Sequence, residues 1–300
     1  MLYYRQKIIL ALLEEFEGSL GRSEFQKYLF LLSENQGIEK KFHFVPYKFG
    51  CYSFQAYKDI QYLVDAKYIQ DENGWEIKDN NANYKSLLTA QDKRLLTELK
   101  KNYGSYKGDD LIRKVYLDYP YYTLHSEIVE RILSKSERAN ANNIINLTLS
   151  KEATHKLFTI GYEGISVEEY INKLIKNNIK VLCDVRKNPL SRKYGFSKSI
   201  LLDLVSKFGI KYVHIPELGI ESDNRKNLKT VKDYADLFDE YEKTVLVNQK
   251  MHINYLYDIF KKEKRIALTC FEEKPEFCHR TRIARYLKNL PDWEYELEEL

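Results

Sequence analysis

The stretch KLFTIGYEGISVEEYINKLIKNNIKVLCDVRKNP, residues 156–189, sets the pattern for the second half of the chain. It holds two apolar runs of strand length, and between them lies a segment with helical spacing that Ser166 and Glu169 begin as a capping box. The same alternation continues with predicted strands at 210–215 and 265–271 and predicted helices at 197–209, about 231–262 and 276–290. Near-continuous apolar strands separated by helices are typical of a parallel sheet that is covered on both faces. We therefore predict a three-layer α/β/α domain over residues 157–300, with a mostly parallel sheet.

The first half of the chain has a different pattern. Helical stripes run through Ile8–Phe16 and Phe25–Leu32, and FHFVPYKFGCYS (42–53) alternates like a strand. A helix at 53–69 and a strand after the Asn73-Gly74 turn follow. This order predicts a mainly helical, winged-helix-like domain over residues 1–133. The polar segment 134–156, rich in Asn, Ser and Lys, is predicted to be a linker.

Composition excludes several classes of protein. The chain has 300 residues, of which 44% are hydrophobic, so it is neither disordered nor a disulfide miniprotein. No apolar run is long enough for a membrane span, and the charged start is not a secretory signal, so we expect a cytoplasmic protein without membrane contact. The net charge is +4 and is spread over both halves, so nucleic-acid binding would need a local basic patch.

Polar segments follow all four predicted strands of the second half. They read GYEG (161–164), DVRKNP (184–189), HIPELG (214–219) and CFEEKPEFCHR (270–280). Because the carboxyl ends of parallel strands meet at one edge of a sheet, ligands of such folds bind there. We therefore expect the functional site at this edge.

The segment after the second strand is basic. Asp184 and Arg186 lie on the same side of the predicted strand. They form either an ion pair, or a site in which Asp184 is a base and Arg186 binds an anion. Arg192 and Lys193 follow, and with nearby aromatic residues they are suited to phosphate and base contacts, although a solvated basic loop has the same composition. Glu217, after the third strand, is a further candidate for substrate contact.

The last strand-to-helix connection carries the most chemistry. Pro275 suits the first turn of a helix, which places Cys278, His279 and Arg280 near an N-terminus that favours anions. We expect Arg280 to face a partly solvated edge and Cys278 to be a reactive thiolate, with His279 as proton carrier. The C-x7-C-H spacing that includes Cys270 matches none of the usual zinc spacings and shows no fourth ligand, so we expect no metal and no cofactor. Walker and G-x-G-x-x-G loops are absent from the sequence.

Two resemblances follow from these motifs. Residues 157–290 resemble the domain-of-unknown-function 488 family in TIGYEG (159–164), CDVRKNPLSRKYGFSK (183–198), IKYVHIPELG (210–219) and the final C-x7-CHR, although many relatives carry His-Ser at Tyr162-Glu163. That resemblance implies a compact α/β/α fold with Asp184, Arg186, Cys278, His279 and Arg280 at one edge, and it implies no particular reaction. Residues 1–80 are similar to winged-helix-like modules of the SocA/Panacea antitoxin type in EFQKYLFLLSENQG, YKFGCYS and DIQYLVDAKYIQ.

These observations favour a prokaryotic enzyme, in regulation or defence, that acts on a phosphate-bearing substrate such as nucleic acid or a nucleotide. Asp184, Cys278 and His279 would be catalytic, and the substrate or its anionic groups would contact Arg186, Arg192, Lys193, Glu217 and Arg280. The alternative is a non-enzymatic regulator, whose α/β domain senses a small anionic ligand while its N-terminal domain binds DNA or a protein partner. A third hypothesis makes Cys278 a redox or sulfur-transfer centre.

Overall fold

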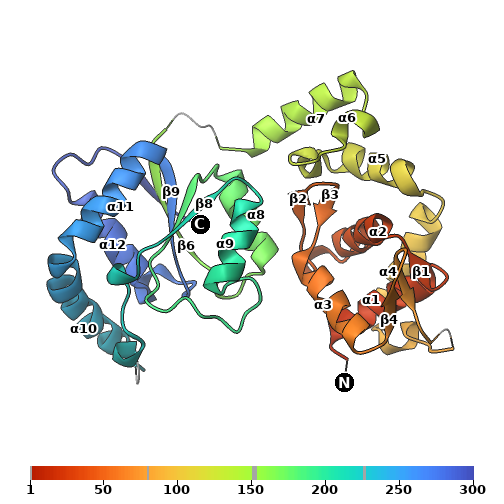
Figure 1. Cartoon of the computed structure of the whole chain (residues 1–300), viewed down its shortest axis with the longest axis horizontal. Coiled ribbons are helices and arrows are strands. Elements are labelled where there is room, and N and C mark those ends of the chain that lie inside the picture. The colour runs from red at the N-terminus through yellow and green to blue at the C-terminus, as the bar shows by residue number, and fades with distance from the viewer. Residues whose placement is uncertain (1, 80, 151–153, 226–227) are drawn as a thin grey trace. The chain divides into compact units, whose positions relative to one another are not determined.

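The computed structural model describes residues 2–79, 81–150, 154–225 and 228–300. The chain forms two compact units, residues 1–148 and residues 149–300 (Figure 1). The first unit is largely helical and the second is a mixed α/β unit, so the predicted fold class is confirmed. None of the helices in the described ranges combines the length and the apolar composition that crossing a membrane requires.

The second unit is built on a five-stranded parallel sheet with the order β10–β6–β9–β7–β8. Four of these strands were predicted, and their described residues are almost all buried in β6, β7 and β9. The strands are β6 (Lys156–Gly161), β7 (Val181–Asp184), β8 (Lys211–His214), β9 (Arg265–Cys270) and β10 (Glu296–Glu299).

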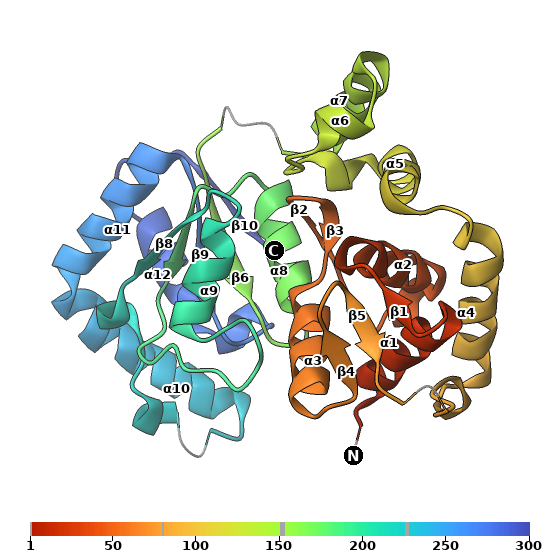
Figure 2. The same cartoon turned by 45° about the vertical axis from the view of Figure 1, so that its right-hand side comes forward.

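Helices cover both faces of this sheet, as Figures 1 and 2 show. The connections from β6 to β7 and from β7 to β8 run in one direction across the sheet, and the later connections run back. Because parallel crossovers are right-handed, the two sets of helices lie on opposite faces. One face carries α8 (Val167–Lys176) and α9 (Lys198–Ser206), and the other carries α10 (Val231–Tyr241), α11 (Lys250–Glu263) and α12 (His279–Lys288).

One helix start of this unit follows the prediction, and three elements differ from it. The capping box is present: the Ser166 hydroxyl accepts from the Glu169 amide, and the Glu169 carboxylate accepts from the Ser166 amide. The helix predicted over 231–262 is divided by a π-helical turn, η6 (Glu242–Leu246), and the last helix begins at His279, after a 3₁₀ turn, η7 (Pro275–Phe277). The edge strand β10 was missed because its Glu-rich sequence lacks an apolar face.

In the first unit the helices pack on one another, and a small antiparallel sheet of order β1–β5–β4 packs against α1 and α3. A separate hairpin, β2–β3, replaces the single strand predicted over 42–53, and Gly50, which follows its two-residue turn and pairs with Tyr47, has a φ of 97°. The elements are α1 (Tyr4–Glu15), β1 (Ser19–Leu20), α2 (Arg22–Asn35), β2 (Val45–Tyr47), β3 (Gly50–Tyr52), α3 (Phe54–Asp65), β4 (Ile69–Asp71), β5 (Trp75–Ile77), α4 (Ala90–Tyr103), α5 (Gly108–Asp118), α6 (Val129–Ile132) and α7 (Lys135–Thr148). The winged-helix assignment of this unit stays a prediction.

Most of the segment predicted as a linker is helical. Residues 135–148 form α7, which buries Ala141 and Ile145 and packs against α5 and the 3₁₀ helix η3 (Pro120–Thr123). The polar composition of 134–156 hid this helix, because its buried residues are few. The first unit therefore reaches residue 148 rather than 133.

Candidate functional site

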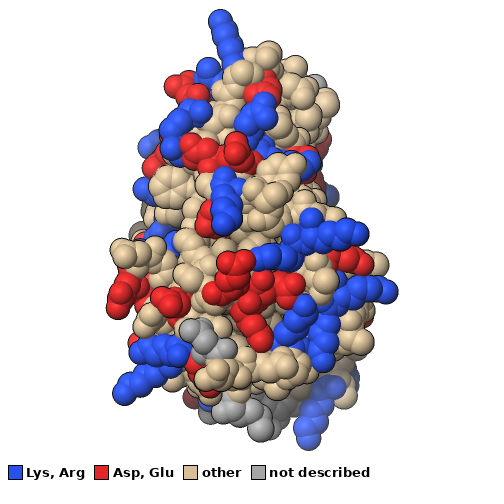
Figure 3. All heavy atoms as spheres, turned by 90° about the vertical axis from the view of Figure 1, so that its right-hand side faces the viewer, with Lys and Arg blue, Asp and Glu red and all other residues tan. Residues whose placement is uncertain are grey.

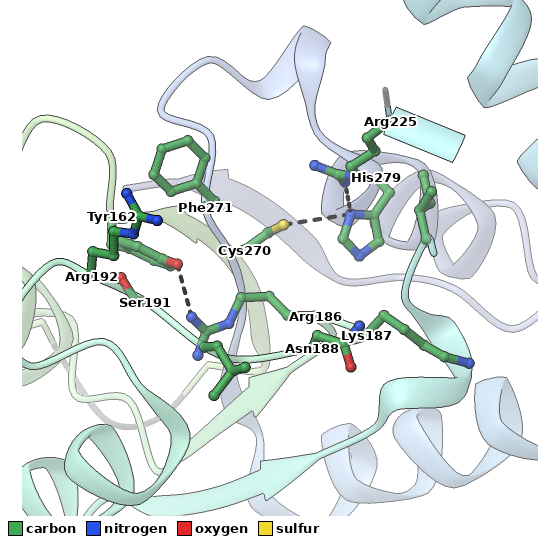
Figure 4. Close-up of a pocket in the computed structure, with 12 residues that line it drawn as sticks. Tyr162, Arg186, Lys187, Asn188, Ser191, Arg192, Arg225, Cys270, Phe271 and His279 are labelled. Carbon is green, nitrogen blue, oxygen red and sulfur yellow. Dashed lines mark hydrogen bonds between the residues drawn. The ribbon is translucent and has the colours of Figure 1, made fainter. Parts of the chain in front are cut away.

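A pocket of about 300 Å³ lies at the carboxyl edge of the sheet in the second unit (Figure 4). The connection that follows β9 crosses one face of the sheet, whereas the connections that follow its neighbours β6 and β7 cross the other face. A crevice opens at the carboxyl edge of a sheet where neighbouring connections diverge in this way. The residues that line the pocket follow β6, β7 and β9 or come from the segment before α10. They are Tyr162, Arg186, Lys187, Asn188, Leu190, Ser191, Arg192, Ile220, Arg225, Cys270, Phe271 and His279.

Asp184 and Arg186 form a buried ion pair beneath one side of the pocket. The Arg186 Nε and Nη2 donate to the two Asp184 carboxylate oxygens at 2.8 and 2.5 Å, and the hydroxyl of Tyr212 donates to Asp184 Oδ2 at 2.5 Å. Burial and the adjacent Asp184 carboxylate raise the pKa of Tyr212 well above its ordinary value. Asp184 is fully buried and does not line the pocket, so the structure favours its ion-pair role over that of an open base.

The loop after β6 is fixed by Arg186 and Lys193. Arg186 Nη1 donates to the Tyr162 hydroxyl at 2.9 Å and to the Phe196 carbonyl at 2.8 Å, so the guanidinium is held in place on several sides. Lys193 Nζ donates to the Tyr162 carbonyl at 2.8 Å. The Tyr162 ring stacks on Phe196 at 4.3 Å and meets the edge of Phe271 at 5.3 Å. Arg186 and Lys193 therefore position the wall of the pocket.

A cluster of two thiols and an imidazole lies at the base of the pocket. The Sγ atoms of Cys270 and Cys278 and a ring nitrogen of His279 lie within 4.8 Å of one another, and all three residues are buried. Cys270 ends β9, Cys278 is the N-cap of α12, and His279 is its first residue. Cys270 and His279 line the pocket, whereas Cys278 does not.

Arg225 and Glu272 complete this cluster from two other segments. Arg225 forms an ion pair with Glu272 and donates through Nη2 to His279 Nδ1 at 2.8 Å. His279 Nε2 lies 2.8 Å from the Val185 carbonyl, to which it must donate, and Glu272 Oε2 lies 3.2 Å from Cys270 Sγ. Figure 4 shows Arg225 and Cys270 both directed toward the imidazole ring.

The two thiols of the cluster differ in acidity. Burial raises the pKa of Cys270, but a hydrogen bond from Cys278, the interactions with His279 and the positive charge of Arg225 outweigh it, so the net pKa is lowered. Burial and the neighbouring Cys270 raise the pKa of Cys278 well above its ordinary value. Cys278, which the sequence suggested as a reactive thiolate, is buried and does not line the pocket, and its catalytic role stays a prediction.

Arg280 was expected to face a partly solvated edge, and that expectation was wrong. Its side chain is 1% exposed, and its guanidinium donates to the backbone carbonyls of Glu272 and Glu273. The helix begins one residue before Arg280, so the side chain turns back under the loop that follows β9. Arg280 therefore holds that loop in place.

The two remaining predicted residues, Arg192 and Glu217, line different pockets. Arg192 is exposed and lines the pocket, and among the described residues no carboxylate pairs with it. Glu217 lies in the 3₁₀ helix η4 (Pro216–Leu218), lines a second pocket of about 150 Å³ and is 3.7 Å from His252. The structure thus places Arg186, Arg192 and His279 at the main pocket and Glu217 outside it.

Sequence reasoning did not assign Cys270, Tyr162, Phe271, Glu272 or Arg225 to the site. Tyr162, Phe271 and Glu272 each come within two residues of the end of a strand, so the argument from strand ends would have identified them. Arg225 lies in the 3₁₀ helix η5 (Ser222–Arg225), far from any strand end, and no pattern in the sequence singles it out.

The fold and pocket together define a parallel α/β domain with a cysteine- and histidine-containing crevice at its switch point. A model of the family described as "Domain of unknown function DUF488" matches residues 166–287, which include β7, β8, β9 and most of the pocket. The predicted C-terminal resemblance is thereby supported, and the SocA/Panacea resemblance of residues 1–80 receives no support. No curated protein and no solved structure matches the chain.

Proposed function

We propose that the second unit is an enzyme that binds a nucleotide, or the end of a nucleic acid, in the pocket at the carboxyl edge of the sheet. The observation that carries this proposal is the pairing of a cation and an aromatic ring at the pocket. Both Arg192 and Phe271 line this pocket, where Arg192 is exposed and Phe271 is 44% exposed. Arginine recognises phosphate through its planar fork, and an exposed ring is a stacking surface for a base.

The other cations at the pocket are already engaged. Lys187 pairs with Glu221 at 2.9 Å, Arg225 pairs with Glu272, and Arg186 pairs with Asp184. An anionic ligand would therefore draw first on Arg192. The pocket volume of about 300 Å³ is at the lower end of the usual range for small-molecule sites, which suits a single nucleotide unit.

The chemistry-bearing side chains lie at the base of the same pocket. Cys270 and His279 line it, and Glu272 lies 3.2 Å from the Cys270 sulfur. A thiol and an imidazole that line the pocket, with a carboxylate next to the thiol, favour an enzyme over a sensor. This arrangement also moves the proposed chemistry from Asp184 and Cys278 to Cys270 and His279.

The test begins with mass spectrometry of ligands that co-purify with the full chain. Binding of nucleoside mono- and diphosphates is then compared for the wild type, Phe271→Ala and Tyr255→Ala, where Tyr255 is an exposed aromatic residue outside the pocket. We expect Phe271→Ala alone to weaken binding, by about tenfold.

Chromatography of the nucleotides after incubation distinguishes the two functions. Consumption of a bound nucleotide supports the enzyme. A nucleotide that binds with Phe271-dependent affinity and is never consumed favours the alternative, in which the unit senses an anionic ligand.

A further inference from the structure

We infer that Cys270, Cys278 and His279 bind a single zinc ion, contrary to the sequence-based expectation of no metal. Buried cysteines and histidines usually pack separately as small core residues. Here three side chains from the end of β9 and the start of α12 bring their ligand atoms within 4.8 Å of one another. Thiolate and imidazole are the ligands that zinc prefers, which distinguishes such a site from one for magnesium or calcium.

The spacing of the ligand atoms fits tetrahedral coordination. With a Zn–S distance of about 2.3 Å and a Zn–N distance of about 2.05 Å, a tetrahedral angle separates the sulfur and nitrogen by about 3.6 Å. The observed distance between Cys270 Sγ and His279 Nδ1 is 3.5 Å. These two atoms are therefore already at ligand spacing, and Cys278 needs at most a small shift to join them.

The imidazole has the support that metal-binding histidines have. His279 Nε2 donates to the Val185 carbonyl at 2.8 Å, which fixes the ring and leaves Nδ1 facing Cys270. A metal-ligating histidine almost always donates its other ring N–H to a carbonyl or carboxylate in this way. The orientation of His279 is thus set from outside the cluster.

Arg225 occupies the position that the metal would share. Its Nη2 donates to His279 Nδ1 at 2.8 Å, so a bound zinc would replace this hydrogen bond, while the ion pair with Glu272 can remain. The arginine and the zinc ion therefore compete for one nitrogen atom. We therefore expect removal of the Arg225 side chain to strengthen zinc binding. If the cluster only packed in the core and bound no metal, this change would have no such effect.

The fourth coordination position would open onto the pocket. Cys270 and His279 line the pocket and Cys278 lies behind them, so a fourth ligand approaches from the pocket side. Three protein ligands with one open position are typical of catalytic zinc, whereas structural sites are closed by four. Glu272, 3.2 Å from the Cys270 sulfur, lies beside this position. A catalytic role for the metal rests on the proposed function, but zinc binding itself does not.

The experiment measures the metal content of the full chain expressed with added zinc, and then titrates the metal-free protein with Zn²⁺ against a chromophoric chelator. We expect about one equivalent of zinc in the wild type, and affinity lower by on the order of 100-fold in Cys270→Ser. Cys183→Ala, which removes a buried cysteine on β7 outside the cluster, is the matched control and should keep the zinc. Arg225→Ala should bind zinc at least as tightly as the wild type.

Titration with Co²⁺ gives a second readout that needs no variant, because cobalt–thiolate bonds produce an intense near-ultraviolet absorption. Wild-type protein with less than about 0.1 equivalent of zinc and no such absorption would overturn the inference. An equal loss of zinc in Cys183→Ala and Cys270→Ser would also overturn it. Zinc bound by a protein that fails to bind nucleotides would instead contradict the proposed function, so the two failures are distinguishable.

Discussion

Both units bury charged side chains, whose stability depends on their hydrogen-bond and ion-pair partners. Asp184 and Arg280 are almost completely buried, and each has partners: Arg186 and Tyr212 for the carboxylate, two backbone carbonyls for the guanidinium. Removal of one partner from a buried charge is costly, because the other partner is left without compensation. Lys27 of the first unit is also buried, and burial lowers its pKa.

Arg280→Ala tests the structural role of this residue. The change leaves the carbonyls of Glu272 and Glu273 without their donor, so we expect the free energy of unfolding of the second unit to fall by about 2–4 kcal/mol. Urea denaturation measures this loss, with Arg285→Ala, an exposed residue of the same helix, as control. Unchanged stability combined with lost nucleotide binding would restore the role that the sequence suggested for Arg280.

Lys27→Met tests the cost of the buried amine. The pKa of Lys27 is lower in the folded state than in the unfolded state, where it is about 10.4, so between these values the unfolded state binds more protons. Lys27 therefore destabilises the first unit most at low pH, where its amine is charged in the folded state, and destabilises it less as the pH rises toward about 10.

We expect Lys27→Met to raise the melting temperature of the first unit at neutral pH and to flatten its rise with pH. Each unit by which the pKa is lowered corresponds to about 1.4 kcal/mol. Lys58→Met, at an exposed position of α3, is the control and should change neither quantity. A variant less stable than the wild type at pH 7 would show that the amine is stabilised by its surroundings.

At the scale of elements, the end of β6 is locked against the loop that follows β9. The amides of Tyr162 and Glu163 donate to the Phe271 carbonyl at 3.1 and 2.9 Å, and Gly161 lies directly against this loop. A Cβ on Gly161 would lie 1.9 Å from the Glu272 carbonyl oxygen, which no rotamer change can relieve because the oxygen belongs to the backbone. The geometry of the pocket base therefore depends on glycine at this position.

Gly161→Ala is expected to destabilise the second unit by about 1–3 kcal/mol or more and to displace Glu272 from Cys270. Thermal denaturation measures the first effect, and zinc or nucleotide titration of the folded fraction measures the second. Gly21→Ala, where the added Cβ makes an ordinary 3.4 Å contact, is the matched control. Equal stability of the two variants would show that the loop yields without cost.

Element patterns predicted the sheet edge but not the partners of its side chains. The polar residues after the strand ends pointed to the carboxyl edge of the sheet, where Arg186, Arg192 and His279 line one pocket, because parallel topology fixes where strands end. The last helix was predicted from residue 276 but begins at His279, with Cys278 as its N-cap outside the pocket lining, and helix boundaries are poorly specified by sequence. Arg225 reaches His279 from the segment between β8 and α10. The path of that segment does not follow from any local sequence pattern.

At the scale of the whole molecule, the two units have separate cores. Among the described residues, one large hydrophobic cluster of the first unit lies within residues 8–115, and that of the second unit lies within residues 157–287. On the face drawn in Figure 3, acidic and basic side chains are interspersed, and they form no basic patch that would identify a nucleic-acid surface there. The DNA- or protein-binding role of the first unit thus stays a prediction.

Independent folding of the units is a direct consequence of separate cores. We expect fragments 1–148 and 149–300, expressed separately, each to unfold cooperatively, and we expect limited proteolysis of the full chain to cut first near their junction, after α7 rather than within it. Fragment 149–300 should keep nucleotide and zinc binding. A fragment that is unfolded alone would show that the two units depend on each other.

Calorimetric titration with nucleoside mono- and diphosphates tests the central claim, that the pocket binds a phosphate-bearing ligand through Arg192. Arg192→Ala and Arg285→Ala each remove one exposed positive charge from the second unit, but only Arg192 lines the pocket. We expect Arg192→Ala to weaken binding by about tenfold, or 1.4 kcal/mol, and Arg285→Ala to match the wild type. Equal affinity of the two variants, or no nucleotide binding by the wild type, would contradict the claim.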